Sequence, residues 1–62
     1  MIKKGDLVKI KDGVHEEGMP LHRHAVIVSD MNEQGDYQVM FFGYEKTFSF
    51  NKFFIVPLQK VD

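Results

Sequence analysis

Three histidines are the residues of this chain best suited to binding a metal ion. His22 and His24 are two residues apart, and His15, Glu16 and Glu17 precede them. Residues two apart in a strand point the same way, so this pair could chelate one ion. The chain has no cysteine, however, and further ligands would have to come from a glycine-bearing loop. We therefore expect a histidine pair at a loop rim, with no physiological metal and no cofactor.

The sequence contains little that indicates catalysis. A nucleophile needs an adjacent base and an oxyanion site within a concave pocket. Ser29 and Ser49 lie in strand-like segments, and no such signature surrounds either of them. Glu16 and Glu17 are neighbours in a loop, where successive side chains tend to point apart. The glycines are scattered singly and form no phosphate-binding loop. We predict that the protein is not an enzyme.

The aromatic residues indicate a binding surface. All eight fall between Tyr37 and Phe54. A domain of about 60 residues buries only about 60% of the surface that its unfolded chain exposes, so some rings are expected to remain outside. Adjacent exposed apolar groups often mark interaction sites. We predict a binding rim formed by two loops and the strand between them, with the members Met19, Leu21, His22, His24, Met40, Phe42 and Tyr44.

Lysines near the start of the chain suggest a second kind of contact. Lys9 and Lys11 lie on the outward face of an alternating segment, with Lys3 and Lys4 nearby, and all four could contact phosphates. Asp12 lies alongside and would oppose such contacts, and the formal net charge of −1 argues against an undirected polyanion binder. The alternative interpretation is a solvated strand that its lysines protect against unwanted pairing.

Glycine, proline and turn-forming residues divide the chain into short extended segments. Alternation at period two in residues 7–11 indicates a half-buried strand with Val8 and Ile10 inward. A polar loop follows over residues 12–21. We expect further strands over residues 25–29, 37–42, 46–50 and 55–58, and a single helical turn over residues 51–54 before the last of them.

The third and fourth segments predict a hairpin of defined register. A type II′ turn centred on residues 43–44 pairs Val39 with Phe48 and Tyr37 with Phe50. One face of this hairpin is then apolar and the other mostly polar. A one-residue slip would exchange the two faces, so the division supports this register.

The turn before the third segment predicts where the second segment lies. Closing that turn on residues 32–35 pairs Val28 with Val39 and Val26 with Phe41. Both valines then join the apolar face of the hairpin. The predicted core consists of Val8, Ile10, Val26, Val28, Tyr37, Val39, Phe41, Phe48, Phe50, Ile55 and Val56.

The order of these segments is similar to that of SH3-like barrels, and two stretches of sequence carry the resemblance. The opening KKGDLVKIKDGVHEEG resembles the start of KOW-type modules of ribosomal proteins and transcription factors. The stretch GMPLHRHAVIV, followed by YQVMFFGYEKTFSF, resembles Tudor and PWWP-type domains. The resemblance implies an all-β protein, a small five-stranded SH3-like barrel that spans residues 1–62 as one domain. It is specific for architecture and not for function, because small barrels host many unrelated tasks.

Each resemblance implies a kind of partner. Tudor-type domains bind methylated side chains in an aromatic cage, and the matching positions here are Leu21, His22, His24, Phe42 and Tyr44. The chain has no Trp, and Leu21 and His22 stand where Trp or Tyr is expected. A cation needs several electron-rich ring faces, so methyl-lysine binding is not predicted, although the same rim could hold a peptide or a nucleobase. KOW-type function implies contact with RNA or with an RNA-bearing machine.

These observations predict a small non-enzymatic module that binds a protein partner through the predicted rim. Two alternatives are a nucleic-acid-binding accessory protein of KOW type and a structural subunit of a larger assembly. A homodimer would relieve the shortage of core. The opening residues lack the apolar stretch of a secretory signal, and no apolar run approaches the roughly 20 residues that span a bilayer. We therefore expect a cytoplasmic protein without membrane contacts, of a size typical of small bacterial or phage accessory proteins.

Overall fold

Five short strands form a single antiparallel sheet in the computed structural model, which describes residues 2–58. The elements are β1 (Leu7–Ile10), β2 (His24–Ile27), β3 (Asp36–Phe41), β4 (Thr47–Asn51), the 3₁₀ turn η1 (Lys52–Phe54) and β5 (Ile55–Pro57). The all-β class and the helical turn before the last strand are thereby confirmed. Within residues 2–58, no helix has the length and apolar character needed to cross a bilayer.

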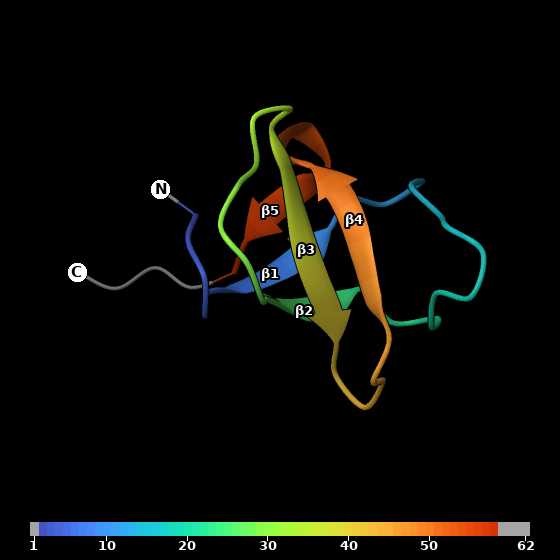
Figure 1. Cartoon of the computed structure of the whole chain (residues 1–62). Helices are drawn as coiled ribbons and strands as arrows, with labels where there is room; N and C mark the ends of the chain where they lie inside the picture. The colour runs from blue at the N-terminus through green and yellow to red at the C-terminus, as the bar shows by residue number, and fades with distance from the viewer. Residues whose placement is uncertain (1, 59–62) are drawn as a thin grey trace.

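The sheet has the order β4-β3-β2-β1-β5. In Figure 1, β1, β2 and β5 cross behind β3 and β4, so the two halves of the sheet lie over one another. The edge strands β4 and β5 are not paired with each other in the described residues, and the sheet is therefore open. The core lies between its two halves.

Alternation along the strands produces this core, because successive side chains of a strand point to opposite faces. Phe41 has no exposed surface, and its ring meets the rings of Phe48 and Phe50 edge-on, with centroids 5.3 and 6.2 Å apart. Aromatic pairs in this geometry contribute about 0.5–1.5 kcal/mol beyond their buried area. The buried apolar residues are Val8, Ile10, Met19, Ala25, Ile27, Tyr37, Val39, Phe41, Phe48, Phe50 and Ile55.

The β3–β4 hairpin has the predicted register but a different turn. Tyr37 pairs with Phe50, and Val39 pairs with Phe48. The predicted two-residue turn at 43–44 is wrong, because the Tyr44 amide donates to the Phe41 carbonyl at 3.0 Å. The turn therefore spans residues 41–44, and its third residue is a glycine with a φ of 82°. A positive φ at that position is easily adopted only by glycine or asparagine.

The predicted register of β2 is wrong by one residue. Ile27 pairs with Val39, and Ala25 pairs with Phe41, so Ala25 and Ile27 face the core. The predicted core residues Val26 and Val28 instead point to the outer face and are half-buried. A shift of one residue necessarily exchanges the faces of a strand.

Extra residues between β2 and the following turn account for this shift. The Asn32 side-chain oxygen accepts hydrogen bonds from the Gln34 and Asp36 amides, both at 2.9 Å. The Asn32 amide also donates to the Asp36 carbonyl at 2.9 Å. Asparagine side chains commonly organise turns in this way. The Gly35 amide donates to the Asn32 carbonyl at 3.1 Å, so the chain turns on residues 32–35, and the Val28 amide donates to the Gln38 carbonyl at 2.9 Å. The chain thus advances four positions from Val28 to Asn32 but only two from Asp36 to Gln38, and these extra residues before the turn shift the register.

The last strand corrects one further core residue. Ile55 is 5% exposed and faces the core, whereas Val56 is 38% exposed and faces outward. The prediction that both are buried is wrong, because neighbouring residues of a strand point to opposite sides. Asn51 sets the start of η1 just before this strand, since its side chain accepts a hydrogen bond from the Phe53 amide at 3.1 Å.

The outer face of the sheet carries a series of paired residues on β1 to β4, which continues to the residue that follows β5. Leu7 pairs with Val26, Val26 pairs with Met40, and Met40 pairs with Thr47. Directly paired residues of antiparallel strands share a face. The Leu58 amide donates to the Leu7 carbonyl, which places Leu58 beside Leu7 just beyond the end of β5. We call this series the outer row; in order, it is Leu58, Leu7, Val26, Met40 and Thr47.

Candidate functional site

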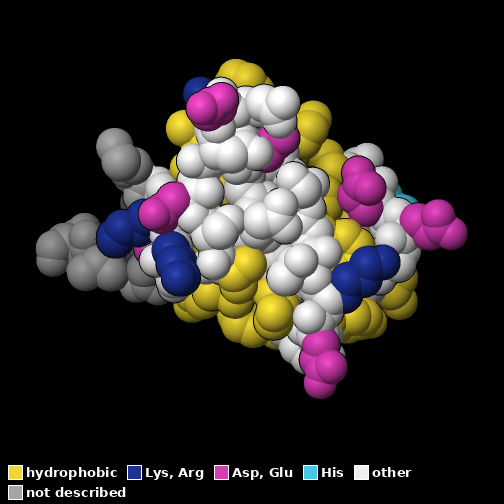
Figure 2. All heavy atoms as spheres, viewed as in Figure 1, with side chains coloured by type: hydrophobic (Ala, Val, Ile, Leu, Met, Phe, Trp, Pro, Cys, Tyr) yellow, Lys and Arg dark blue, Asp and Glu magenta, His cyan; other side chains and the backbone are white. Residues whose placement is uncertain are grey.

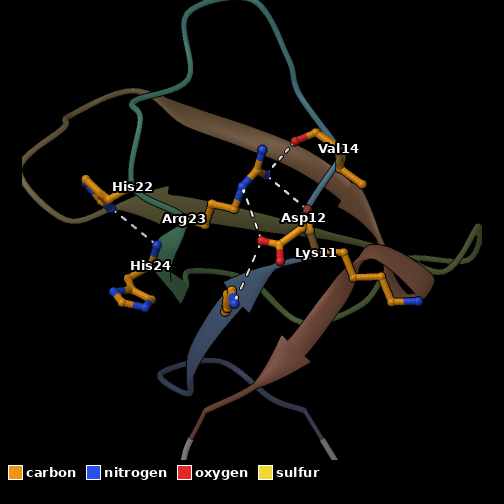
Figure 3. A network of polar contacts seen from close by, with 7 residues as sticks. Lys11, Asp12, Val14, His22, Arg23 and His24 are labelled. Atoms are coloured by element: carbon orange, nitrogen blue, oxygen red, sulfur yellow. Dashed lines mark hydrogen bonds and ion pairs between the residues drawn. The ribbon is translucent and has the colours of Figure 1, made fainter.

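His22 lies in the loop that precedes β2 and contacts the turn that follows β3. One ring nitrogen, Nε2, lies 3.0 Å from the carbonyl oxygen of Phe42, in the β3–β4 turn. The other, Nδ1, accepts a hydrogen bond from the His24 amide at 3.2 Å. Because Nδ1 accepts, Nε2 carries the proton and donates to Phe42. Figure 3 shows the contact between His22 and the start of β2. This imidazole therefore joins the loop before β2 to the turn after β3.

Three other rings surround this histidine. The His22 centroid lies 6.1 Å from that of Phe41 and 6.1 Å from that of Tyr44, both edge-on. The His24 ring lies 6.4 Å away at a tilt of 42°. Phe41 belongs to the core and has no exposed surface, whereas 43% of Tyr44 is exposed. The site is therefore supported from below by a buried ring and has exposed rings beside it.

The structure brings together five of the seven residues predicted for the binding rim. We call these five the His22 rim: Leu21, His22, His24, Phe42 and Tyr44. Leu21 is fully exposed, and Phe42 is 49% exposed. Leu21 precedes His22 in the chain, and the backbone of Phe42 is held by the hydrogen bond from the His22 ring to its carbonyl. The result is an open apolar and aromatic surface on two connected loops.

Met19 does not belong to this surface. Only 9% of it is exposed, and it packs in the hydrophobic core. Its sulfur accepts a hydrogen bond from the Glu16 amide at 3.2 Å, which closes the loop on itself. Its assignment to the binding rim is therefore wrong, because a buried methionine has no surface to offer a partner.

Met40 borders the His22 rim. It is half-buried on the outer face of β3, between Val26 on β2 and Thr47 on β4, and belongs to the outer row. The prediction grouped Met40 with Phe42 because both point away from the core. Phe42 lies two residues further along the chain, opposite His24, whose carbonyl accepts a hydrogen bond from the Phe42 amide at 3.3 Å.

The five residues of the His22 rim are those predicted to match the cage positions of Tudor-type domains. His22 lies within 6.4 Å of the rings of Phe41, Tyr44 and His24, so these rings gather around an imidazole. A cation needs ring faces turned toward a shared space. The edge-on contacts of His22 with Phe41 and Tyr44 do not provide that arrangement.

Of the four lysines predicted to contact phosphates, Lys3 and Lys9 have their ammonium groups beside carboxylates, and Lys11 is exposed. Lys3 lies 3.9 Å from Asp6, and Lys9 lies 3.8 Å from Asp12. The Lys4 amide donates to the Asp30 side chain at 3.2 Å. These exposed pairs contribute little to stability. They do lower the positive potential that a polyanion would meet at this end of the sheet.

Arg23 fixes the shape of the long loop between β1 and β2. One guanidinium nitrogen, Nη1, donates to the carbonyls of Lys11 and Val14, at 3.0 and 2.6 Å. Nε lies 3.8 Å from a carboxylate oxygen of Asp12. Figure 3 shows the side chain of Arg23 reaching across to the start of this loop. Since Arg23 separates His22 from His24, this clamp also orients the His22 rim.

Neither a metal cluster nor a lined pocket occurs at the His22 rim. Residues 2–58 contain no group of three histidine or carboxylate side chains that could hold an ion. A hollow of about 260 Å³ lies instead at the β2–β3 turn, lined by Asn32, Glu33 and Gln34. That volume is below the roughly 300–1,000 Å³ of small-molecule sites, and the lining is polar where such sites are mostly apolar.

Sequence reasoning missed the outer row. Leu7 could be predicted to point outward, because Val8 and Ile10 were already predicted to face inward. Val26 could not, because it was itself predicted to lie in the core. A signal that could have identified it is the run of residues 25–28, which is apolar at every position and must therefore expose some of its members. Comparison with protein-family models, curated proteins and solved structures finds no match to this chain.

Proposed function

We propose that this protein is a small non-enzymatic binding module of SH3-like barrel type, which holds an apolar segment of a protein partner on the His22 rim. The observation that carries the proposal is the partial exposure of Phe42 and Tyr44 on one short turn that His22 holds in place. Preorganised aromatic side chains give contact area at low entropic cost, which favours their use in recognition.

The exposed area sets the affinity that such a rim can provide. Fully burying one large apolar side chain stabilises a complex by about 1.5–3 kcal/mol. Phe42 and Tyr44 are each about half exposed, at 49% and 43%, so each can contribute roughly half of that amount. Leu21, which is fully exposed, can contribute the whole amount. After the cost of association, these contributions correspond to a modest affinity suited to an adaptor.

Two features favour a protein partner over nucleic acid. The basic side chains Lys3 and Lys9 lie beside Asp6 and Asp12, which weakens an electrostatic attraction to phosphates. The charge nearest to Tyr44 along the chain is a carboxylate, Glu45. The exposed rings could stack on bases, but single-strand binding normally combines stacking with a positive groove.

The barrel assignment is supported by the strand order. The order β4-β3-β2-β1-β5 places a meander of four strands beside a last strand that returns to β1. The 3₁₀ turn η1 supplies that return, and β4 and β5 form the two edges. Rotation of one half of the sheet over the other encloses the core as a small barrel does (Figure 1).

Affinity capture with matched variants tests the proposed function. The wild-type protein, Phe42→Ala and Phe53→Ala would each be immobilised and exposed to lysate of the source cells, with and without nuclease. Phe53 is the control, because it is 69% exposed but lies on η1, at the other end of β4 from the turn that carries Phe42. We expect one or more proteins to be retained by wild type and by Phe53→Ala, and lost from Phe42→Ala.

Titration of the retained protein then gives the magnitude. Loss of the exposed half of Phe42 should weaken binding by roughly 3- to 15-fold, and Phe53→Ala should leave it unchanged. Affinity that falls steeply with salt, or retention that nuclease abolishes, would instead support the nucleic-acid alternative. Equal binding by Phe42→Ala and wild type would contradict the use of this rim.

A further inference from the structure

The free edge of β5 is protected against the addition of a further strand. The Phe54 carbonyl and the Leu58 amide bond to the segment of β1. Ile55 and Pro57 alternate with them and therefore face the free edge. The Ile55 amide already donates to the Lys52 carbonyl, and a proline has no amide hydrogen. A strand added here would find no backbone donor on Ile55 or Pro57.

The free edge of β4, by contrast, presents a row of backbone groups. In an antiparallel pair, residues bonded across the ladder alternate with residues whose backbone groups point to the other side. The Lys52 amide donates to the Gly35 carbonyl at 2.8 Å, which fixes this alternation. Thr47, Ser49 and the amide of Asn51 then point away from β3. No strand of the described residues pairs with that side of β4.

β4 also lacks the features that protect an edge strand. Its residues Thr47–Asn51 include no proline and no charged residue, and its pairing with β3 is regular, without a bulge. The β1–β2 loop approaches β4 from the core side, since a Cβ at Gly18 would lie 3.9 Å from the buried Phe48 ring. Figure 2 shows the face of β3 and β4 beside this edge as mainly uncharged polar side chains and backbone. This edge is therefore open to a further strand.

A positive charge stands at each end of this edge. Lys46 precedes β4 and Lys52 follows it, and both are exposed. None of the ion pairs in residues 2–58 involves either lysine. The one carboxylate next to them in the chain is that of Glu45. An added strand with acidic residues at its ends would therefore meet an opposite charge at both.

We propose that an extended segment of a partner protein, with two acidic residues six positions apart, adds to β4 as a sixth antiparallel strand. A second copy of this chain is a poorer occupant. Two β4 strands paired antiparallel about Ser49 place Lys46 of each copy opposite Lys52 of the other. Like charges in directly opposite positions destabilise a strand pair, and opposite charges stabilise it. The lysines that oppose self-pairing thus favour an acidic strand.

NMR titration with a designed peptide tests this proposal. The peptide has seven residues, with glutamate at both ends and alternating threonine and valine between them. Antiparallel to β4, it places its central threonine opposite Ser49 and its two glutamates opposite the lysines. We expect a dissociation constant of about 0.1–1 mM, because backbone bonds act here without deep side-chain pockets. The amides of Thr47, Ser49 and Asn51 should shift and exchange more slowly, and the Phe48 amide, which faces β3, should change less.

Three modified peptides provide matched controls. N-methylation of the central threonine removes an amide that faces β4, which should weaken binding at least about 10-fold. N-methylation of a neighbouring valine removes an amide that faces solvent and should leave binding unchanged. Replacing both glutamates by lysine should weaken binding about 10-fold, because like charges then meet at both ends.

Variants of the protein test the same contacts from the other side. Ser49→Pro removes an outward amide and no ladder bond to β3, so it should fold and lose binding, whereas Ser49→Thr keeps the amide and should bind like wild type. The double variant Lys46→Glu with Lys52→Glu should prefer the lysine-ended peptide to the acidic one. The N-methylated peptides give the same test on the wild-type protein, whatever the stability of these variants.

Several results would overturn the proposal. The first is an absence of shifts in the β4 amides at about 5 mM acidic peptide. Equal binding of the two N-methylated peptides, or of the acidic and lysine-ended peptides, would do the same. Shifts of these amides with protein concentration alone would assign the edge to a second copy. Phe42 and Tyr44 are not on this edge, so none of these results affects the test of the His22 rim.

Discussion

Phe41 is the last residue of β3 and Phe42 the first residue after it, and replacing each by alanine should have unequal effects on stability. Phe41 has no exposed surface, whereas 49% of Phe42 is exposed. Replacing a buried phenylalanine by alanine typically costs about 3–5 kcal/mol, from lost transfer free energy and the cavity that remains. The edge-on contacts of Phe41 with Phe48 and Phe50 place this case toward the upper end.

The total stability available decides what this cost means. A domain of 62 residues is stable by roughly 3–9 kcal/mol. Phe41→Ala therefore removes most of the free energy of unfolding and leaves the protein partly or wholly unfolded at 25 °C. Phe42→Ala removes only a half-exposed ring and should cost about 1 kcal/mol. In a domain of this size, that loss lowers the melting temperature by about 4–8 °C.

Urea denaturation followed by circular dichroism measures both effects. The slope of the free energy against urea should be the same for wild type and Phe42→Ala, because the surface exposed on unfolding is nearly unchanged. Phe41→Ala should show no cooperative transition, or one at much lower urea. A near-native midpoint for Phe41→Ala, or an equal loss in the two variants, would refute the assignment of these faces.

Two further substitutions test the loops that shape the sheet. Gly35→Ala forces a residue with a Cβ into a φ of 85° and brings that Cβ within 3.4 Å of the Asn51 side chain, so it should lower stability by about 1–2 kcal/mol. Gly13→Ala has a similar φ of 90° but open space around it, and thermal melts should show a smaller loss; equal losses would mean that the contact is irrelevant. Arg23→Lys keeps the charge but not the planar guanidinium, so hydrogen exchange in the β1–β2 loop should become faster at a nearly unchanged melting temperature. Unchanged exchange in that loop would show that Arg23 does not hold it.

The parts of the fold that sequence predicted correctly are those with clear alternation. In β1, Val8 and Ile10 alternate with Lys9, so only one face could be buried, and the prediction is confirmed. In the β3–β4 hairpin, two strands with the same alternation reinforce each other, and the pairing of Val39 with Phe48 follows. Period-two patterns determine which residues face inward whenever the two faces differ in polarity.

The outward position of one member of the predicted rim followed from alternation, whereas others depended on features that no pattern shows. Phe42 directly follows β3, whose last residue Phe41 is buried, so Phe42 points outward. The predicted phase of β2, with Val26 inward, would instead have turned His24 toward the core. Met19 lies in a loop without periodic structure, and its burial depends on tertiary contacts. The central role of His22 depends on a hydrogen bond to a carbonyl of another loop, which no local pattern indicates.

The register of β2 could not be predicted, for a reason that bears on the outer row. Residues 25–28 are apolar at every position, so alternation fits either phase equally well. The phase is set outside this run, by the extra residues between Val28 and the turn that begins at Asn32. In either phase, half of this run must lie outside, next to Met40 on the neighbouring strand. An apolar patch on the outer face of β2 is therefore a consequence of composition, and the residues between β2 and the turn decided only that Val26, and not Ile27, lies beside Met40.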